Sequence, residues 1–142
     1  MPAHRLECRP ATAEEENAAR ACLTEHAAEV GGIVSDDWSG EPFSVLALCE
    51  NKVVGGLIGR IFWDWLHAGL IWVEKPFRGS GIGKDVMIRV EEKARDRGLT
   101  GIYLWTQSWQ APGFYRKLGF EQFVVFENFP LGYSRIGFRK YL

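Results

Sequence analysis

A segment in the middle of the chain joins an apolar strand to a helix through a glycine-rich turn. Residues 70–73 read Leu-Ile-Trp-Val and predict a strand, and apolar residues at four-residue intervals from Ile82 to Ala94 predict a helix. Between them, residues 78–84 read Arg-Gly-Ser-Gly-Ile-Gly-Lys. Glycines let the backbone come close to a ligand, and a helix N-terminus offers unpaired N–H groups and a positive dipole end. The segment therefore predicts a site for phosphate.

Two common phosphate-binding loops do not fit this turn. A dinucleotide loop, G-x-G-x-x-G, that begins at Gly79 needs glycine at position 84, where the chain has Lys84. A nucleoside triphosphate loop needs glycine at 78 and Ser or Thr at 85, where the chain has Arg78 and Asp85. The pattern that fits is Arg-x-x-Gly-x-Gly, which resembles the acyl-coenzyme-A loop of the GNAT family of N-acetyltransferases. The alternative is a glycine-rich turn that binds no ligand.

A second motif supports the same resemblance. Residues 108–120 read Ser-Trp-Gln-Ala-Pro-Gly-Phe-Tyr-Arg-Lys-Leu-Gly-Phe, which is similar to the A-x-x-F-Y-x-K-L-G-F segment of that family. The spacing also agrees, because a predicted helix and strand separate the two motifs. The match departs from the family at Ser108, where many members have an Asn that helps to hold the pantetheine arm of coenzyme A.

The resemblance implies an α/β fold in a single domain over residues 1–142. Its mixed, mostly antiparallel central sheet has about six or seven strands and is flanked by helices. Two parallel strands splay apart in such a fold, and acetyl coenzyme A lies in the gap like an added strand. The implied cofactor-binding residues are Ile71, Trp72, Val73, Arg78, Gly79, Ser80, Gly81, Ile82, Gly83, Lys84, Ser108 and Phe114.

Periodicity and turn signals place the elements along the chain. Strands are predicted at 5–9, 43–49, about 69–73 and 102–105, with a long arm over 53–65 and a final antiparallel pair at 120–126 and 134–141. Helices are predicted after a capping box of Thr12 and Glu15, over 81–97, and over 113–118. Because residues 102–105 are apolar on both faces, we expect that strand to be buried and parallel to the one before the glycine turn.

Composition excludes several other classes of protein. The net charge is −1, so no overall field favours nucleic acid or an anionic membrane. No apolar run approaches the ~20 residues of a membrane span. Cys8, Cys22 and Cys49 lack a C-x-x-C spacing, and we expect them to be reduced core residues of a cytoplasmic protein. The histidines are scattered, so we expect no metal site.

The resemblance implies direct transfer of an acetyl group to an amine. Tyr115 matches the general acid of the family by position and would protonate the leaving thiolate. The general base stays open, because the strand over 69–73 has no carboxylate where some members have a Glu. Asp64, which stands between two Trp residues, and His67 are candidates, since burial would raise a carboxyl pKa and His titrates near neutral pH. A chain of waters, with both residues facing solvent, is the alternative.

The acceptor is predicted to be a small-molecule amine. Aromatic rings and carboxylates suit a cationic amine, and the candidate acceptor residues are Asp36, Asp37, Trp38, Trp63 and Trp65. For residues 36–38, a solvated loop with an anchoring Trp is the alternative that their composition favours. A protein or peptide acceptor is one alternative function, and a sensor that binds acyl coenzyme A without turnover is another. The apolar strand residues 124–126 and Phe138 could pair two copies of the chain as a homodimer.

Overall fold

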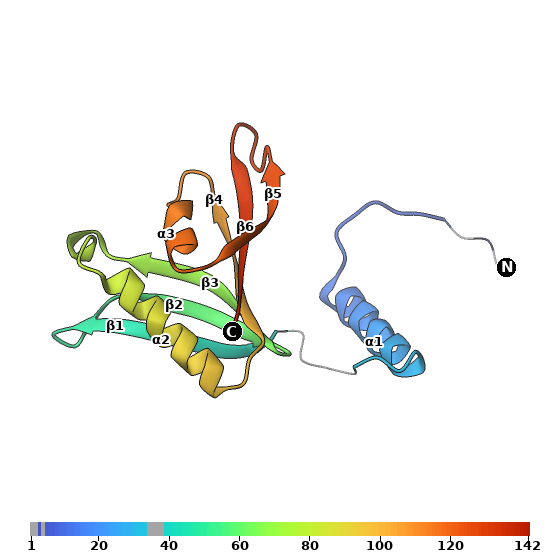
Figure 1. The fold of residues 1–142 in the computed structure, drawn as a ribbon. Coiled ribbons are helices and arrows are strands. Elements are labelled where there is room, and N and C mark those ends of the chain that lie inside the picture. Colours follow the sequence, from blue (N-terminus) through green and yellow to red (C-terminus); the bar gives the residue numbers. More distant parts are fainter. Residues whose placement is uncertain (1–2, 4, 34–38) are drawn as a thin grey trace. The chain divides into compact units, whose positions relative to one another are not determined.

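The computed structural model describes residues 3, 5–33 and 39–142. The chain forms two compact units, residues 1–38 and residues 39–142, and each is described here by itself (Figure 1). The prediction of a single domain stays a prediction. The acceptor candidates Asp36, Asp37 and Trp38 lie outside the described residues.

The N-terminal unit is built on helix α1, Ala13–Glu29. The predicted capping box is confirmed: the Thr12 side chain accepts from the Glu15 N–H at 3.2 Å, and the Glu15 carboxylate accepts from the Thr12 N–H at 2.9 Å. Arg9 adds two charge-assisted hydrogen bonds of 2.9 Å to the same carboxylate and lowers the pKa of Glu15 to about 2. Gly31, with φ of +74°, follows the end of the helix.

One prediction for this unit is not met. Residues 5–9 form no strand, and Arg9 instead extends the cap of α1. Helix α1 has no buried side chain within the described structure.

The larger unit is a six-stranded sheet with the order β1-β2-β3-β4-β6-β5. The strands are β1 Glu41–Cys49, β2 Lys52–Phe62, β3 Trp65–Val73, β4 Gly101–Gln107, β5 Glu121–Glu127 and β6 Ser134–Tyr141. The helices are the 3₁₀ turn η1 Lys75–Phe77, α2 Ile82–Asp96 and α3 Pro112–Lys117. Neighbouring strands are antiparallel except β3 and β4, which are parallel, so the predicted mixed sheet is confirmed.

The boundary between β2 and β3 differs from the prediction. The chain turns at Trp63 and Asp64, and β3 begins at Trp65 rather than near Gly69. The turn holds no glycine, and Trp63 takes the left-handed φ of +50° in its place. Without Gly or Pro at the turn, the hydrophobic run continued through it and hid the boundary.

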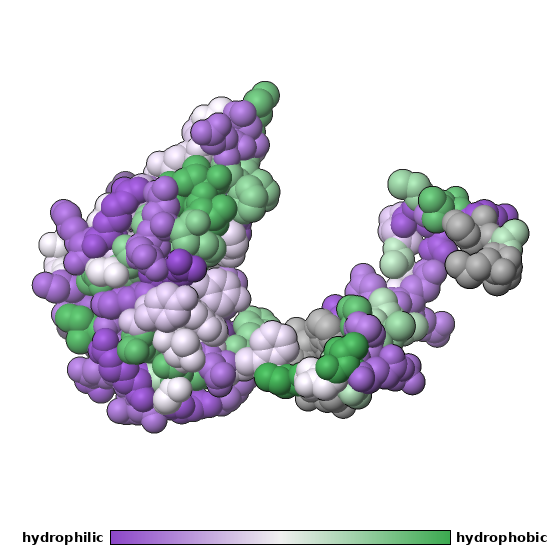
Figure 2. All heavy atoms as spheres, turned by 45° about the vertical axis from the view of Figure 1, so that its right-hand side comes forward, coloured by the Kyte–Doolittle hydropathy of each residue, from purple (hydrophilic) through white to green (hydrophobic). Residues whose placement is uncertain are grey.

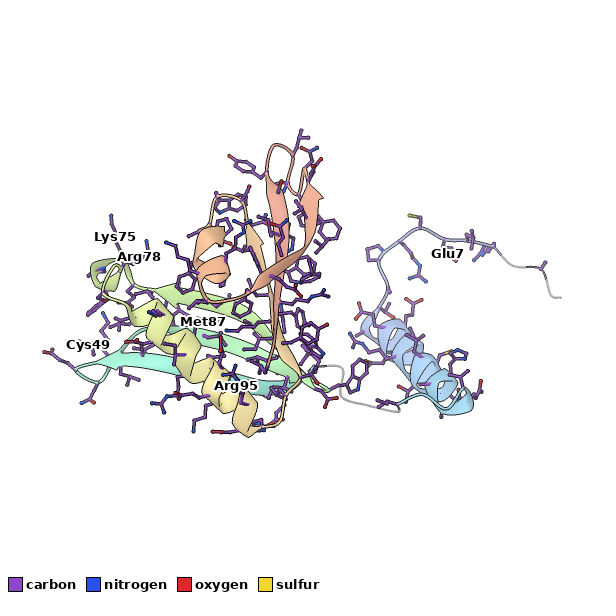
Figure 3. All side chains as sticks on the ribbon, viewed as in Figure 1. Glu7, Cys49, Lys75, Arg78, Met87 and Arg95 are labelled. Carbon is purple, nitrogen blue, oxygen red and sulfur yellow. The ribbon has the colours of Figure 1, made fainter. Side chains whose placement is uncertain are left out.

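One face of the sheet carries both α2 and α3, as Figure 1 shows. Helix α2 buries Val86, Met87, Val90 and Ala94 against sheet residues that include Leu57, Leu66, Ile102 and Phe138. Met87 points from α2 toward the sheet in Figure 3 and is fully buried, which stabilises the unit by about 1.5–3 kcal/mol. The Lys140 ammonium joins the two helices, since it donates to Glu91 of α2 and to the Leu118 carbonyl after α3, both at 2.7 Å.

The prediction that the cysteines are core residues is wrong. Cys8, Cys22 and Cys49 are all exposed and free. Cys49 ends β1 at the hairpin tip, which Figure 3 shows at the far end of the sheet, beyond the helices that cover its centre. Cys8 and Cys22 belong to the N-terminal unit, where helix α1 has no buried residue.

Candidate active site

The parallel strands β3 and β4 separate soon after they meet. They pair at Trp65 with Gly101, Leu66 with Ile102 and His67 with Tyr103, and no further. Beyond these pairs β3 continues to Val73 and β4 to Gln107, so both strands leave unpaired backbone groups facing the gap. The predicted splay is therefore present, and it opens a cleft of about 780 Å³.

A bulge in β3 lies at the start of this cleft. Ile58 of β2 pairs with Leu70, and Gly59 pairs with Ala68, so Gly69 is an extra residue without a partner. A bulge bends its strand and re-aims the backbone groups on either side of it. Because Ala68, Gly69 and Leu70 all line the cleft, the bulge turns the backbone of β3 away from β4 at the point where the gap begins.

Glycines in β2 hold β3 close on its other side. A Cβ atom added at Gly55 would lie 2.8 Å from the Trp72 carbonyl oxygen, and one added at Gly59 would overlap the His67 carbonyl oxygen. At both positions only glycine allows the two backbones to approach this closely. The pairing of β2 with β3 thus fixes the outer wall of the cleft.

The glycine-rich turn closes one end of the cleft. Gly79 and Gly81 have φ values of +80° and +89°, and Gly81 is the N-cap of α2. Asp85 donates the first N–H bond of the helix, to Gly81, so the N–H groups of residues 82–84 have no partner within α2. These donors, together with the positive end of the helix, are the groups that an anion site needs, and the phosphate site itself stays a prediction.

Arg78 is anchored beside this turn. Its Nε donates to the Val73 carbonyl at 2.8 Å, which ties the side chain to the end of β3 and leaves the terminal nitrogens for a ligand. Figure 3 shows Lys75 and Arg78 together in the loop between β3 and α2. Lys84 also lines the cleft. Ser80 does not, because its hydroxyl donates to the Phe77 carbonyl at 2.6 Å and holds the loop instead.

Tyr115 lies in the wall of the cleft on the side of α3. Its ring packs against Phe114, Phe120 and Phe138, with centroid distances of 5.2, 6.1 and 5.7 Å. Burial raises the pKa of Tyr115, so the phenol is protonated at neutral pH. No described residue hydrogen-bonds to its hydroxyl. Phe114 lines the cleft as well and packs against Gly83 of the loop.

The side chain that the structure places in the cleft after β4 is Gln110, not Ser108. The Gln110 Oε1 accepts from the Thr106 hydroxyl at 2.9 Å and from the Gln107 N–H at 3.0 Å. This anchoring leaves the Gln110 amide nitrogen free to donate into the cleft. The Ser108 hydroxyl accepts from the Ser134 N–H at 3.0 Å and so joins β4 to β6. Gln110 was not predicted, because Ser108 occupies the position at which many family members have an Asn.

His67 lies on the sheet face opposite α2, beside the start of the cleft. Its ring stacks on Tyr103 with centroids 4.8 Å apart. Burial lowers the pKa of His67, and the positive charge of Arg135 lowers it further, so the imidazole is neutral at pH 7. Trp65 shares this face and packs edge-on against Tyr103 and Tyr141, at centroid distances of 6.3 and 5.1 Å.

The two residues of the turn between β2 and β3 lie apart from the cleft lining. Asp64 and Trp63 form the exposed turn between β2 and β3, and the Asp64 carbonyl accepts from the Thr100 N–H at 2.7 Å. The lining begins at Ala68, four positions after Asp64, which is about 13 Å along an extended chain. His67 is adjacent to Ala68 in the chain.

Two other features, a metal-binding group and a membrane-spanning helix, are absent from the described residues. Within them, no three His, Cys, Asp or Glu side chains are grouped closely enough to hold a metal ion. No helix among them is long and apolar enough to cross a membrane. The cytoplasmic location stays a prediction.

Comparison with known proteins identifies the family. The model of the acetyltransferase (GNAT) family matches residues 7–120. A blasticidin-S acetyltransferase of Streptomyces morookaense is 38% identical over 84 residues, which cover 58% of this chain and 62% of that protein. The match thus spans less than two thirds of that relative.

Solved structures share the fold. The crystal structure of an acetyltransferase from Bacillus cereus ATCC 14579 is 28% identical with a TM-score of 0.82, and the match covers 96% of this chain and 98% of that one. A candidate streptothricin acetyltransferase from Bacillus anthracis, solved with acetyl coenzyme A, has a TM-score of 0.65 at 23% identity over 75% of this chain and 65% of its own. Members of the matched family are acyl-coenzyme-A-dependent N-acetyltransferases. The chain belongs to the GNAT family of acetyltransferases.

Proposed function

We propose that the protein transfers an acetyl group from acetyl coenzyme A to a primary amine of a small molecule. The observation that carries this proposal is the splayed β3–β4 cleft, which ends at a glycine-rich helix N-terminus and has Tyr115 in its wall. An anion site, an extended groove and a proton donor are the three parts that acyl transfer from a phosphate-bearing thioester needs.

The donor would occupy the length of the cleft. Its pyrophosphate is held by the N–H groups of residues 79–84 and by Arg78, and its pantetheine amides pair with the unpaired backbone of Ile71, Trp72 and Val73. The amide nitrogen of Gln110 is positioned to donate to a pantetheine carbonyl from the opposite wall. Under this proposal Ser108 and Ser80 support the walls rather than touch the donor.

The reaction follows from the groups around the thioester. A neutral amine attacks the thioester carbonyl carbon, so that a C–N bond forms and the C–S bond breaks. The amine proton passes to a base, and the Tyr115 hydroxyl donates its proton to the leaving thiolate. The tyrosinate then regains a proton from solvent. No covalent intermediate on the protein is required.

His67 is the base that we favour over Asp64. Its neutral imidazole can accept a proton at pH 7, and it lies beside the start of the cleft on the face opposite α2 and α3. Those two helices close the other face, so the acceptor would approach past His67, Tyr103 and Trp105. Under this proposal Asp64 and Trp63 play no direct part. A water that bridges His67 and the amine would serve the same purpose.

A homodimer through β5 is a separate proposal. β5 is an edge strand and exposes Phe123, Val125 and Phe126, and Figure 2 shows hydrophobic atoms at the surface of the larger unit. Phe138, which the sequence suggested for this role, is fully buried and takes no part. Light scattering of the wild-type protein and of Val125→Glu tests it: a dimer that becomes a monomer supports the proposal, and a wild-type monomer contradicts it.

Turnover tests the proposed function. The full chain is incubated with acetyl coenzyme A and a panel of small amines, aminoglycosides and short peptides, and acetylated products are detected by mass spectrometry. A thiol reagent is avoided because the exposed cysteines would react with it. We expect acetylation of at least one small amine. Acetylation of peptides alone would favour the peptide acceptor, and acetyl coenzyme A binding without any product would favour a sensor.

A further inference from the structure

Arg135 stands out among the charged residues of the larger unit. It lies in β6 opposite Gln107 of β4, and its guanidinium carbon is 5.3 Å from the ring centroid of Trp105 and 5.4 Å from that of Phe129. Two aromatic rings thus contact the guanidinium. Such contacts hold the side chain in place while its N–H edge remains able to donate hydrogen bonds.

No carboxylate pairs with Arg135 among the described residues. Arg139, on the same face of β6, does have a carboxylate partner. Arg139 also lies over two rings, those of Phe123 and Tyr141, at 5.3 and 5.6 Å, but its Nε donates to Glu121 at 2.8 Å. Arg135 has the same aromatic setting without the acid. A half-buried cation that lacks a counter-ion is an unfavourable arrangement unless a ligand supplies one.

The location of Arg135 connects it to the cleft. Trp105, which the guanidinium contacts, lines the cleft, and the charge of Arg135 is close enough to act on His67. The Oε1 atom of Gln107, which pairs with Arg135 across the sheet, is buried and receives no hydrogen bond from the described residues, so the same area holds one oxygen without a donor. Arg135 therefore faces the side from which the amine substrate would approach.

We propose that Arg135 binds a carboxylate on the acceptor, so that the substrate is an amine that also carries an acidic group. This inference rests on the proposed function, because only that function makes the bound molecule an acetyl acceptor. A planar carboxylate matches the two parallel N–H donors of a guanidinium, which is the geometry that favours Arg over Lys. The aromatic rings contact the aliphatic part of the same molecule.

Matched amine pairs test the proposal, since each pair differs only by a carboxylate. The pairs are L-2,4-diaminobutyrate with 1,3-diaminopropane, L-ornithine with putrescine, and L-lysine with cadaverine. Calorimetry on the protein saturated with coenzyme A measures binding without catalysis. We expect wild-type protein to bind at least one carboxylated member more than tenfold tighter than its partner. Equal affinities within every pair, or binding of no carboxylated member, would overturn the proposal.

Variants at Arg135 and Arg139 test whether Arg135 causes the preference for the carboxylated amine. Arg135→Gln should abolish the preference, Arg135→Lys should keep only part of it, and Arg139→Gln should leave it unchanged because Arg139 already has an acid partner. A preference that survives Arg135→Gln in protein with a wild-type circular dichroism spectrum would overturn the proposal, as would its loss in Arg139→Gln alone. Product formation is measured separately, so an Arg135-dependent preference without turnover would reject the proposed function but not the site.

Discussion

The phosphate site proposed at the start of α2 gives the sharpest test of donor binding. Gly81 has φ of +89°, and no atom lies within 4 Å of the position that a Cβ would take there. A side chain at this position therefore fits sterically, and it would stand at the N-cap of α2, beside the N–H groups proposed to hold the pyrophosphate. Gly81→Asp adds a negative charge there.

The magnitude follows from Coulomb's law and from backbone strain. A carboxylate about 5 Å from a phosphate charge is repelled by about 0.8–3.3 kcal/mol for effective dielectric constants of about 80 to 20. The left-handed φ costs a residue with a side chain about 1–2 kcal/mol of stability. Gly81→Asn is the matched control, because Asn has the shape of Asp, tolerates left-handed φ, and carries no charge.

Calorimetry with acetyl coenzyme A measures the outcome. We expect Gly81→Asp to bind more than tenfold weaker than Gly81→Asn, which corresponds to about 1.4 kcal/mol. The difference should shrink as the salt concentration rises, since the added charge is exposed. Thermal unfolding should show similar stabilities for the two variants. Equal donor affinities of Gly81→Asp, Gly81→Asn and the wild type would remove the glycine loop from the donor site.

Three further predictions concern the cleft. Tyr115→Phe should lower kcat by about 10²-fold or more with little change in donor affinity, and near-normal kcat would refute the acid role. The pKa of His67 is lowered, so the decline of kcat/KM on the acidic side should lie below pH 6.5, the ordinary pKa of histidine. His67→Gln should remove that limb and cost about 10²-fold, whereas Asp64→Asn should stay near wild type, and the reverse result would exchange their roles. Gln110→Ala should raise the KM for acetyl coenzyme A about tenfold, because about one hydrogen bond to the donor is lost. Ser108→Ala should lower only the melting temperature. Equal effects of the two substitutions on KM would contradict the assignment of Gln110 to the donor site.

Local features of the molecule were readable from the sequence. The capping box of α1 and the helix that follows the glycine turn depend on interactions within a few residues, and both were predicted. The parallel strand at residues 101–107 was predicted as well, because a strand that is buried on both faces must be apolar throughout. The two motifs also indicated the family that the comparison later identified.

Predictions failed where the outcome depended on partners distant in sequence. Residues 5–9 alternate like a strand, but a strand forms only beside another one. The start of β3 was placed too late because its register is set by pairing with β2 and by the bulge at Gly69. Cys49 looked like a core residue from its apolar neighbours, yet the end of its strand extends beyond the helices.

The sequence by itself determined that this chain has a strand, a glycine-rich turn and a helix in the order that a GNAT protein needs. Only the tertiary structure decided that β3 and β4 part after His67 and Tyr103, and that Gln110 rather than Ser108 enters the opening. It also placed Arg135 over the rings of Trp105 and Phe129, where no described acid pairs with it. The physical reason is range: backbone conformation and capping are set by adjacent residues, whereas a cleft and its charges are set by strands that meet only in the folded sheet.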